Sequence, residues 1–283
     1  MSTLGFGDRL AQAMEQKGPL CVGIDPHPAL LRDWGLADRP ESLLTFGQAV
    51  LEACGPLAAT LKPQVALFER HGSAGLAALE QLQRQAAEAG VLLIADAKRG
   101  DIGSTMAAYA DAWLGEGRPL ATDAVTLSPY LGFESLRPAL DLAQATGRGT
   151  FVLALTSNPE GQTVQHVGGD QSVAGAIIAA AQAENSSQTW SEMGSCGLVV
   201  GATVGQALNK LKIDLTGFNG PILSPGFGAQ GASAADLYRV FAGLESQVLV
   251  NSSRGILAAG PDLSALRQAA KEARDQLLAA RRV

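Results

Sequence analysis

The sequence is poor in cysteine, histidine and long apolar runs. Its three cysteines are an odd number without a C-x-x-C spacing, which argues against a disulfide framework and against a structural zinc site. The three histidines are scattered and show no metal-ligand spacing. No run of about 18 apolar residues is present, so we expect no membrane span. The N-terminal segment carries Asp8 and Glu15 and lacks the apolar core of a signal peptide, which favours a cytoplasmic location.

Basic side chains are too few and too dispersed to predict a nucleic-acid or anionic-membrane partner. The chain has 21 Lys and Arg residues against 27 Asp and Glu, a net charge of −6, and contains no Lys/Arg-rich run. It also has no Walker-type loop, and no G-x-G-x-x-G motif opens a helix after the first apolar run. We therefore expect neither a nucleotide cofactor nor a metal.

Eight short apolar or β-branched runs recur along the 283 residues, each followed by a turn and then by a helical pattern. The runs are continuous rather than alternating, as in parallel strands covered on both faces. Strand and helix repeated eight times predict an α/β protein, a (β/α)8 barrel that forms one domain over residues 1–283. A doubly wound open sheet shares this local pattern and is the alternative. The runs are 20–24, 58–61, 91–95, 124–127, 150–155, 196–201, 221–223 and 247–250.

Polar side chains follow several of these predicted strands. In a barrel of this type, functional residues lie at the carboxyl ends of the strands, where the βα loops meet. We therefore expect the residues that follow the strands to gather at one end of the barrel. They are Asp25, Lys62, Asp96, Lys98, Asp101, Ser157, Gln230 and Arg254.

The segment after the third strand, DAKRGD, carries the densest charge. Lys62, Asp96, Lys98 and Asp101 are tolerated in an apolar barrel mouth only if they neutralise one another, so we expect one coupled network. A lysine between carboxylates keeps its proton, and Lys98 is then poised to protonate a carbanion. Asp96 and Asp101 would repel an anionic leaving group. The alternative is a salt-bridged turn at the surface.

The loops after the seventh and eighth strands predict a phosphate site. Gly226, Gly228 and Gly231 allow backbone amides to approach a ligand, while Ser253 and Arg254 precede a predicted helix. Backbone N–H groups and an arginine bind phosphate at this position in many barrels. Taken singly, the glycines would indicate tight turns and Arg254 a surface ion pair.

The run LLIADAKRGDIGST, with Lys62 before it, resembles the orotidine 5′-phosphate decarboxylase family, and in particular its larger bacterial subgroup with DAKRGD. The resemblance extends over the whole chain. It implies conversion of orotidine 5′-phosphate to UMP and CO2, the last step of de novo UMP synthesis, without a metal or an organic cofactor. The segments between Asp25 and Lys62 and after the fifth strand are longer than in compact family members.

The resemblance also implies roles for residues around the reacting carbon. Lys98 would protonate C6, and Asp96 would face the departing carboxylate. Asp101 and Thr105 would reach across the interface of a homodimer into the partner's site.

Further implied roles concern the rest of the substrate. Asp25 and Lys62 would hold the ribose hydroxyls, and Ser157 would contact the pyrimidine. The phosphate would be bound by Gln230 and Arg254, with backbone near Pro225 and Ser253.

Two other functions share parts of this pattern. Related sugar-phosphate decarboxylases and aldolases also carry D-x-K-x-x-D, but they use magnesium held partly by an acidic residue after the second strand. That position here is Lys62, which would repel the metal. A non-catalytic phosphosugar-binding barrel should have lost at least one member of the charged set, and none is missing.

Overall fold

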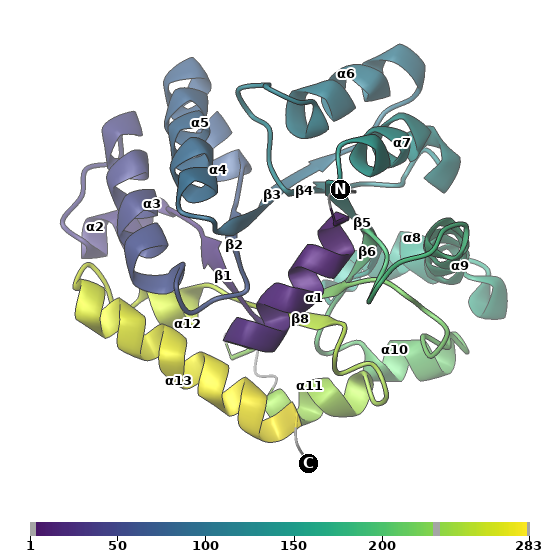
Figure 1. The fold of residues 1–283 in the computed structure, drawn as a ribbon. Coiled ribbons are helices and arrows are strands. Elements are labelled where there is room, and N and C mark those ends of the chain that lie inside the picture. Colours follow the sequence, from purple (N-terminus) through teal and green to yellow (C-terminus); the bar gives the residue numbers. More distant parts are fainter. Residues whose placement is uncertain (1–3, 229–232, 282–283) are drawn as a thin grey trace.

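A closed barrel of eight parallel strands forms the centre of the protein in the computed structural model, which describes residues 4–228 and 233–281 (Figure 1). The strands follow one another around the barrel in chain order, and β1 pairs with β8 to close it. The predicted (β/α)8 barrel is therefore confirmed, and the open sheet is excluded. The strands are β1 Leu20–Ile24, β2 Thr60–Pro63, β3 Leu92–Arg99, β4 Ala124–Leu127, β5 Gly149–Leu155, β6 Cys196–Val200, β7 Ile222–Pro225 and β8 Val248–Ser252.

The strand ends differ from the predicted ones mainly at the carboxyl side. β1 and β4 have the predicted bounds, whereas β2, β3, β7 and β8 continue beyond the apolar runs. The added residues include Lys62, Asp96 and Lys98, whose polar side chains gave no strand signal although the strands continue through them. The extensions thus carry the polar residues that the sequence pointed to.

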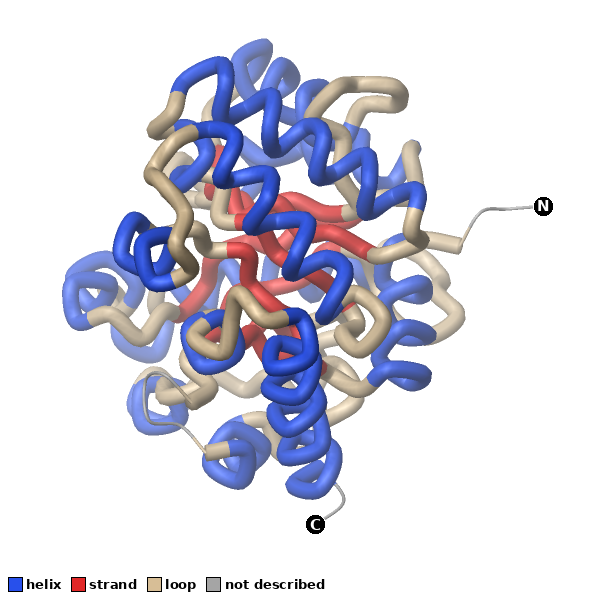
Figure 2. The backbone as a smooth tube through the Cα atoms, turned by 90° about the vertical axis from the view of Figure 1, so that its left-hand side faces the viewer, coloured by secondary structure: helices blue, strands red, loops and turns tan. Residues whose placement is uncertain are grey.

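Helices surround the strands on the outside, as the turned view shows (Figure 2). In α5, Leu79, Leu82, Gln83 and Ala86 are buried at helical spacing, and the chain turns at Gly90 with φ of +66° soon after the helix ends. The other α-helices outside the barrel also bury at least one residue each, except the short α8, which buries none. The outer α-helices are α2 Pro28–Asp33, α3 Pro40–Cys54, α4 Ala66–Glu69, α5 Gly72–Glu88, α6 Gly103–Leu114, α7 Arg137–Ala145, α8 Gln162–Gln165, α9 Val173–Ser186, α10 Gly205–Lys210, α11 Ala234–Val240, α12 Arg254–Leu257 and α13 Leu263–Arg281.

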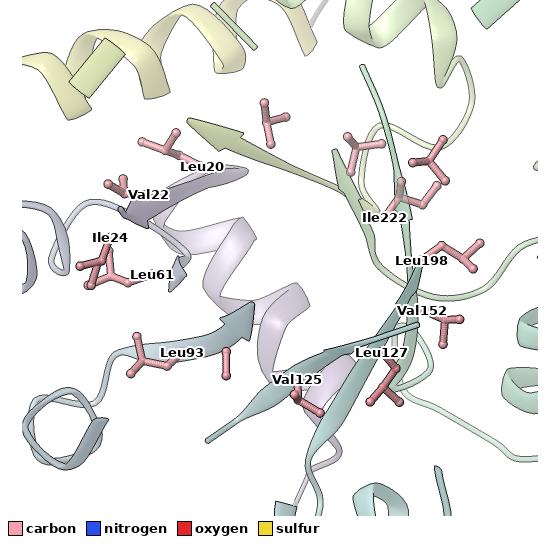
Figure 3. Close-up of a cluster of buried hydrophobic side chains, with 14 of the residues drawn as sticks. Leu20, Val22, Ile24, Leu61, Leu93, Val125, Leu127, Val152, Leu198 and Ile222 are labelled. Carbon is pink, nitrogen blue, oxygen red and sulfur yellow. The ribbon is translucent and has the colours of Figure 1, made fainter. Parts of the chain in front are cut away.

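Alternate residues of the strands build two separate cores. Val125 and Leu127 point outward into the layer between the barrel and its helices, together with the other labelled side chains of Figure 3. Ala124 and Phe151 belong to the second core, inside the barrel. The alternation follows from the two-residue period of a strand, and it leaves every second residue free to line the barrel interior.

The first helix, α1 (Phe6–Lys17), closes the amino-terminal end of the barrel (Figure 1). Its Phe6, Leu10 and Met14 are buried in the inner core, and the Phe6 ring meets that of Phe151 edge to face at 5.9 Å. A Cβ on Gly149 would lie 2.1 Å from the Phe6 ring, so only glycine fits under this plug. One barrel end is thus sealed by apolar packing, and a ligand must enter at the other. No helix in the described ranges combines the length and apolarity needed to cross a membrane.

Candidate active site

A cavity of about 980 Å³ opens at the carboxyl ends of the strands. This is the end of a (β/α)8 barrel at which active sites are found. The cavity brings together most residues that the sequence singled out. Those that line it are Asp25, Lys62, Asp96, Lys98, Pro225, Ser253 and Arg254.

The interior of the barrel changes from apolar to polar toward this cavity. Along β3, Ile94 lies in the inner core, while Asp96 and Lys98 line the cavity. Along β4, Ala124 is followed in the same way by Thr126. The inward-facing residues of these strands therefore pack in the inner core near the strand starts and line the cavity at the carboxyl ends.

Asp96 is the centre of the polar cluster, and four side-chain donors converge on its carboxylate. Lys62 Nζ lies 2.8 Å from Oδ2, and Lys98 Nζ lies 2.5 Å from Oδ1. The Thr126 hydroxyl donates to Oδ1 at 3.0 Å, and the Gln64 amide donates to Oδ2 at 3.1 Å. Both carboxylate oxygens therefore have two donors each, which fixes the orientation of the group.

These contacts keep the cluster ionised despite its burial. Burial alone would raise the pKa of Asp96, but the adjacent ammonium groups of Lys62 and Lys98 hold it well below the ordinary range. Burial alone would likewise lower the pKa of Lys62, and the carboxylates of Asp96 and Asp25 overcome this and raise it above the usual lysine value. At neutral pH the cavity thus contains a fixed carboxylate between two cations.

Lys98 has an unusual backbone. Its φ of +48° lies in the left-handed region that lysine seldom adopts, and β3 shifts its register against β4 between Ala95 and Arg99. The Lys98 N–H donates to the Thr126 hydroxyl at 2.9 Å, which in turn donates to Asp96. Strain of this kind is typical of functional positions, and here it directs a half-exposed lysine side chain into the cavity.

Asp25 offers an acceptor that the protein itself leaves unused. Its Oδ1 atom is buried and has no hydrogen-bond partner among the described residues. Strand β1 approaches Ser253 closely, because a Cβ on Gly23 would lie 1.9 Å from the Ser253 hydroxyl. A buried acceptor without a donor is costly, so a ligand hydroxyl at this position would bind favourably.

The loops after β7 and β8 form another part of the cavity wall. Pro225, Gly226, Ser253 and Arg254 line it, and Gly226 adopts a φ of +112° that favours glycine. The Arg254 side chain is exposed at the start of α12. The predicted residues Gln230 and Gly231 lie outside the described residues.

Three predicted residues do not line the cavity of this chain. Asp101 is half-buried just after β3, and its Oδ1 accepts a hydrogen bond from the Ile102 N–H at 2.8 Å. Thr105 is exposed on α6, and Ser157 is exposed after β5, where the neighbouring Thr156 lines the cavity instead. Within one chain the charged cluster is therefore formed by Lys62, Asp96 and Lys98, without Asp101.

The cavity is also lined by polar residues that were not predicted from the sequence. Gln64 follows directly after β2, and its backbone bridges to that of Asp96. Thr126 and Asn251 occupy inward positions near the ends of β4 and β8. The sequence signal that could have identified each of them is a single polar residue within or directly after an apolar strand.

The side chains in the described ranges include no group of three His, Cys, Asp or Glu residues that could hold a metal ion. Lys62 occupies the end of β2, where an acidic ligand would be needed by the magnesium-dependent relatives.

This chain is similar to known proteins over most of its length. Residues 18–269 match the orotidine 5′-phosphate decarboxylase / HUMPS family. An orotidine 5′-phosphate decarboxylase from Streptomyces coelicolor is 54% identical over 267 residues, which cover 94% of each chain. A crystal structure from Streptomyces avermitilis, provisionally assigned the same activity, superposes with a TM-score of 0.93 at 53% identity and covers 100% of this chain and 98% of its own. The structure of the Leishmania donovani OMP decarboxylase superposes with a TM-score of 0.78 at 33% identity. The match covers 99% of this chain and 100% of the Leishmania chain.

Proposed function

The chain belongs to the orotidine 5′-phosphate decarboxylase / HUMPS family, and we propose that its reaction is carried out by the cluster of Lys62, Asp96 and Lys98. The protein is a carboxy-lyase that converts orotidine 5′-phosphate to UMP and CO2 in pyrimidine biosynthesis. The observation that carries the mechanistic proposal is the ionised Asp96 held between two lysines in the barrel mouth.

Lys98 supplies both charge stabilisation and the proton. When the bond between C6 and the carboxylate breaks, its electron pair stays on C6 and CO2 departs. No adjacent carbonyl is positioned as an ordinary electron sink, so a cation already in place must stabilise the developing carbanion. The Lys98 ammonium then transfers a proton to C6 to give UMP, and the neutral amine regains a proton from water.

Asp96 acts on the substrate carboxylate. Its own carboxylate cannot take up a proton at neutral pH, because Lys62 and Lys98 hold its pKa low. A substrate carboxylate placed next to it is repelled, and this repulsion disappears when neutral CO2 leaves. Contacts to the ribose and phosphate supply the binding energy that holds the two like charges together.

The remaining contacts follow the layout of the cavity. Asp25 accepts from a ribose hydroxyl, which would satisfy its buried Oδ1, and Lys62 also reaches the ribose. Arg254 binds the phosphate together with backbone near Pro225 and Ser253. Gln230 contacts the phosphate as well, and Ser157 contacts the pyrimidine.

We place Asp101 and Thr105 in the active site of a partner subunit. Both lie outside the cavity of their own chain, on the segment that leads into α6 and on α6 itself. Ile102 is 61% exposed, and Tyr130 and Leu131 expose further apolar surface after β4. Large exposed apolar side chains of this kind favour an interface, here that of a homodimer.

We also propose that the reaction needs neither a metal nor an organic cofactor, since Lys62 would repel a cation at the end of β2. Three buried free cysteines are compatible with a reducing compartment and support a cytoplasmic location.

The mechanism is tested by Lys98→Ala, with Lys212→Ala as a surface control. Ultraviolet assays of orotidine 5′-phosphate decarboxylation should show that Lys98→Ala loses most turnover, while its affinity for UMP stays near that of the wild type. Lys212, which is 72% exposed and paired with Asp170, should be dispensable. Turnover near the wild-type rate in folded Lys98→Ala would remove this lysine from the mechanism.

A further inference from the structure

A second polar cavity, of about 280 Å³, lies at the opposite end of the barrel from the active site. It is formed where α1 passes the starts of β3, β4 and β5, far along the strands from the catalytic cluster. No residue that lines it also lines the catalytic cavity. Its polar side chains are Arg9, Gln83, Thr122, Asp123, Thr146 and Arg148.

This second cavity has one more cation than its carboxylate can neutralise. Arg9 donates to Asp123 Oδ1 at 2.6 Å and to the Gly147 carbonyl at 3.1 Å. The other oxygen of Asp123 accepts from the Leu93 N–H at 3.0 Å, so each of its carboxylate oxygens already has one donor. Among the described residues, neither oxygen accepts a hydrogen bond from the second arginine, Arg148.

Arg148 is the arginine of this cavity that has no carboxylate partner among the described residues. Its Nη1 donates to the Thr122 carbonyl, and within residues 4–228 and 233–281 it forms no ion pair with a carboxylate. Burial lowers the pKa of Arg148, and the charges of the nearby Asp123 and Glu116 carboxylates do not fully offset this loss of water. The cavity therefore has a net positive charge and free N–H donors.

Gln83 adds a buried polar group that the protein does not satisfy. It is 4% exposed on α5 and lines the cavity. Among the described residues, neither its amide nitrogen nor its amide oxygen has a hydrogen-bond partner. A buried amide without partners is unfavourable, so it points to a ligand or an ordered molecule beside it.

We propose that this cavity binds a small oxyanion of the class of inorganic phosphate. Arg148 and Arg9 supply charge-assisted hydrogen bonds, and the Gln83 amide nitrogen supplies a further donor. The anion joins α1 to the starts of β4 and β5, and so holds the plug in the barrel. Its effect is on the stability of the fold, and the site is separate from the phosphate subsite at Arg254.

The test measures the unfolding temperature against inorganic phosphate at constant ionic strength set with chloride. Saturating UMP is present throughout, so that the catalytic phosphate subsite is already filled. Wild-type protein should become more stable with phosphate, and Arg148→Gln should need at least about tenfold more phosphate for the same shift, since it loses a hydrogen bond to a charged group. Arg239→Gln, a 75% exposed arginine paired with Asp236, is the matched control and should respond like the wild type.

A second variant keeps the test decisive if Arg148→Gln fails to fold. Gln83→Leu should raise the unfolding temperature without phosphate, because it removes the unpartnered amide, and it should weaken the phosphate response. Equal responses of wild-type and Arg148→Gln protein would show a general salt effect and overturn the site. A less stable Gln83→Leu with a full phosphate response would overturn it as well, because the amide would then have its partner inside the protein.

Discussion

Lys62 donates a 2.8 Å hydrogen bond to Asp96 across the neighbouring strands β2 and β3, with 4% and 9% of the two residues exposed. The pair is built into the barrel wall, because both residues belong to strands whose backbones are fixed by the sheet. Asp96 also bonds to Lys98, so the buried pair aligns the residue that we propose as the proton donor. A charge array fixed before substrate arrives needs little rearrangement during the reaction.

This arrangement predicts how Asp96 affects stability with pH. Its folded-state pKa is lowered, so its ionised form stabilises the fold above the unfolded-state pKa of about 4, and this contribution is lost as pH falls through the folded-state value. Asp96→Asn should cost about 3–5 kcal/mol at neutral pH, because it leaves the buried Lys62 without its hydrogen-bonded carboxylate partner.

Urea unfolding of both proteins between neutral pH and about pH 3 measures the difference. The gap in unfolding free energy should narrow as the pH falls below about 4. A gap that stays constant over this range would mean that Asp96 titrates normally in the folded protein.

The sequence allowed the barrel and its polar mouth to be predicted, because continuous apolar runs mark buried parallel strands. It misplaced the carboxyl ends of β2 and β3, since these strands continue through Lys62 and Lys98 without an apolar signal. It also grouped Asp101 with the cluster on grounds of proximity in the chain. The left-handed turn at Lys98 and the register shift of β3 are tertiary features, and Asp101 follows them out of the cavity.

The plug formed by α1 was not predicted, although Phe6, Leu10 and Met14 are spaced four residues apart and mark one helix face. That spacing predicts a buried face but does not say what covers it. Only the closed barrel provides the surface on which this helix packs.

Removing the plug's largest side chain should destabilise the protein. Phe6 is fully buried against Phe151, so Phe6→Ala should lower the unfolding free energy by about 3–5 kcal/mol through lost burial and a residual cavity. Leu4→Ala, at a 41% exposed position, should change it by less than about 0.5 kcal/mol. Urea denaturation checks both values, and similar losses for the two variants would show that α1 does not seal the barrel.

Arg254 should matter through the phosphate of the substrate. Arg254→Ala should lose about 1.5–3 kcal/mol, the worth of a hydrogen bond to a charged group, or roughly 10- to 150-fold in kcat/KM for orotidine 5′-phosphate. Orotidine without its phosphate should be affected far less. Steady-state kinetics with both substrates make the comparison, and equal losses would place Arg254 in another role.

Sharing of Asp101 between subunits can be tested by mixing two inactive variants. In a heterodimer of Asp101→Asn and Lys98→Ala, the first subunit keeps its own Lys98 and receives an intact Asp101 from its partner. That site should be active, while the other site lacks both groups. Random exchange makes half of the dimers mixed, each with one working site, so activity should return to about a quarter of the wild-type value per subunit.

The mixing experiment depends on proof that the subunits exchange, which differently tagged variants and co-purification provide. Each variant alone should stay nearly inactive, and a mixture of Lys98→Ala with Asp96→Asn should give no recovery, because both residues line the cavity of their own chain. The Asp101 mixture should recover because Asp101 lies outside that cavity, beside the exposed Ile102. If tagged heterodimers form and remain inactive, Asp101 serves its own subunit, and a movement of the segment before α6 would be needed to bring it to Lys98.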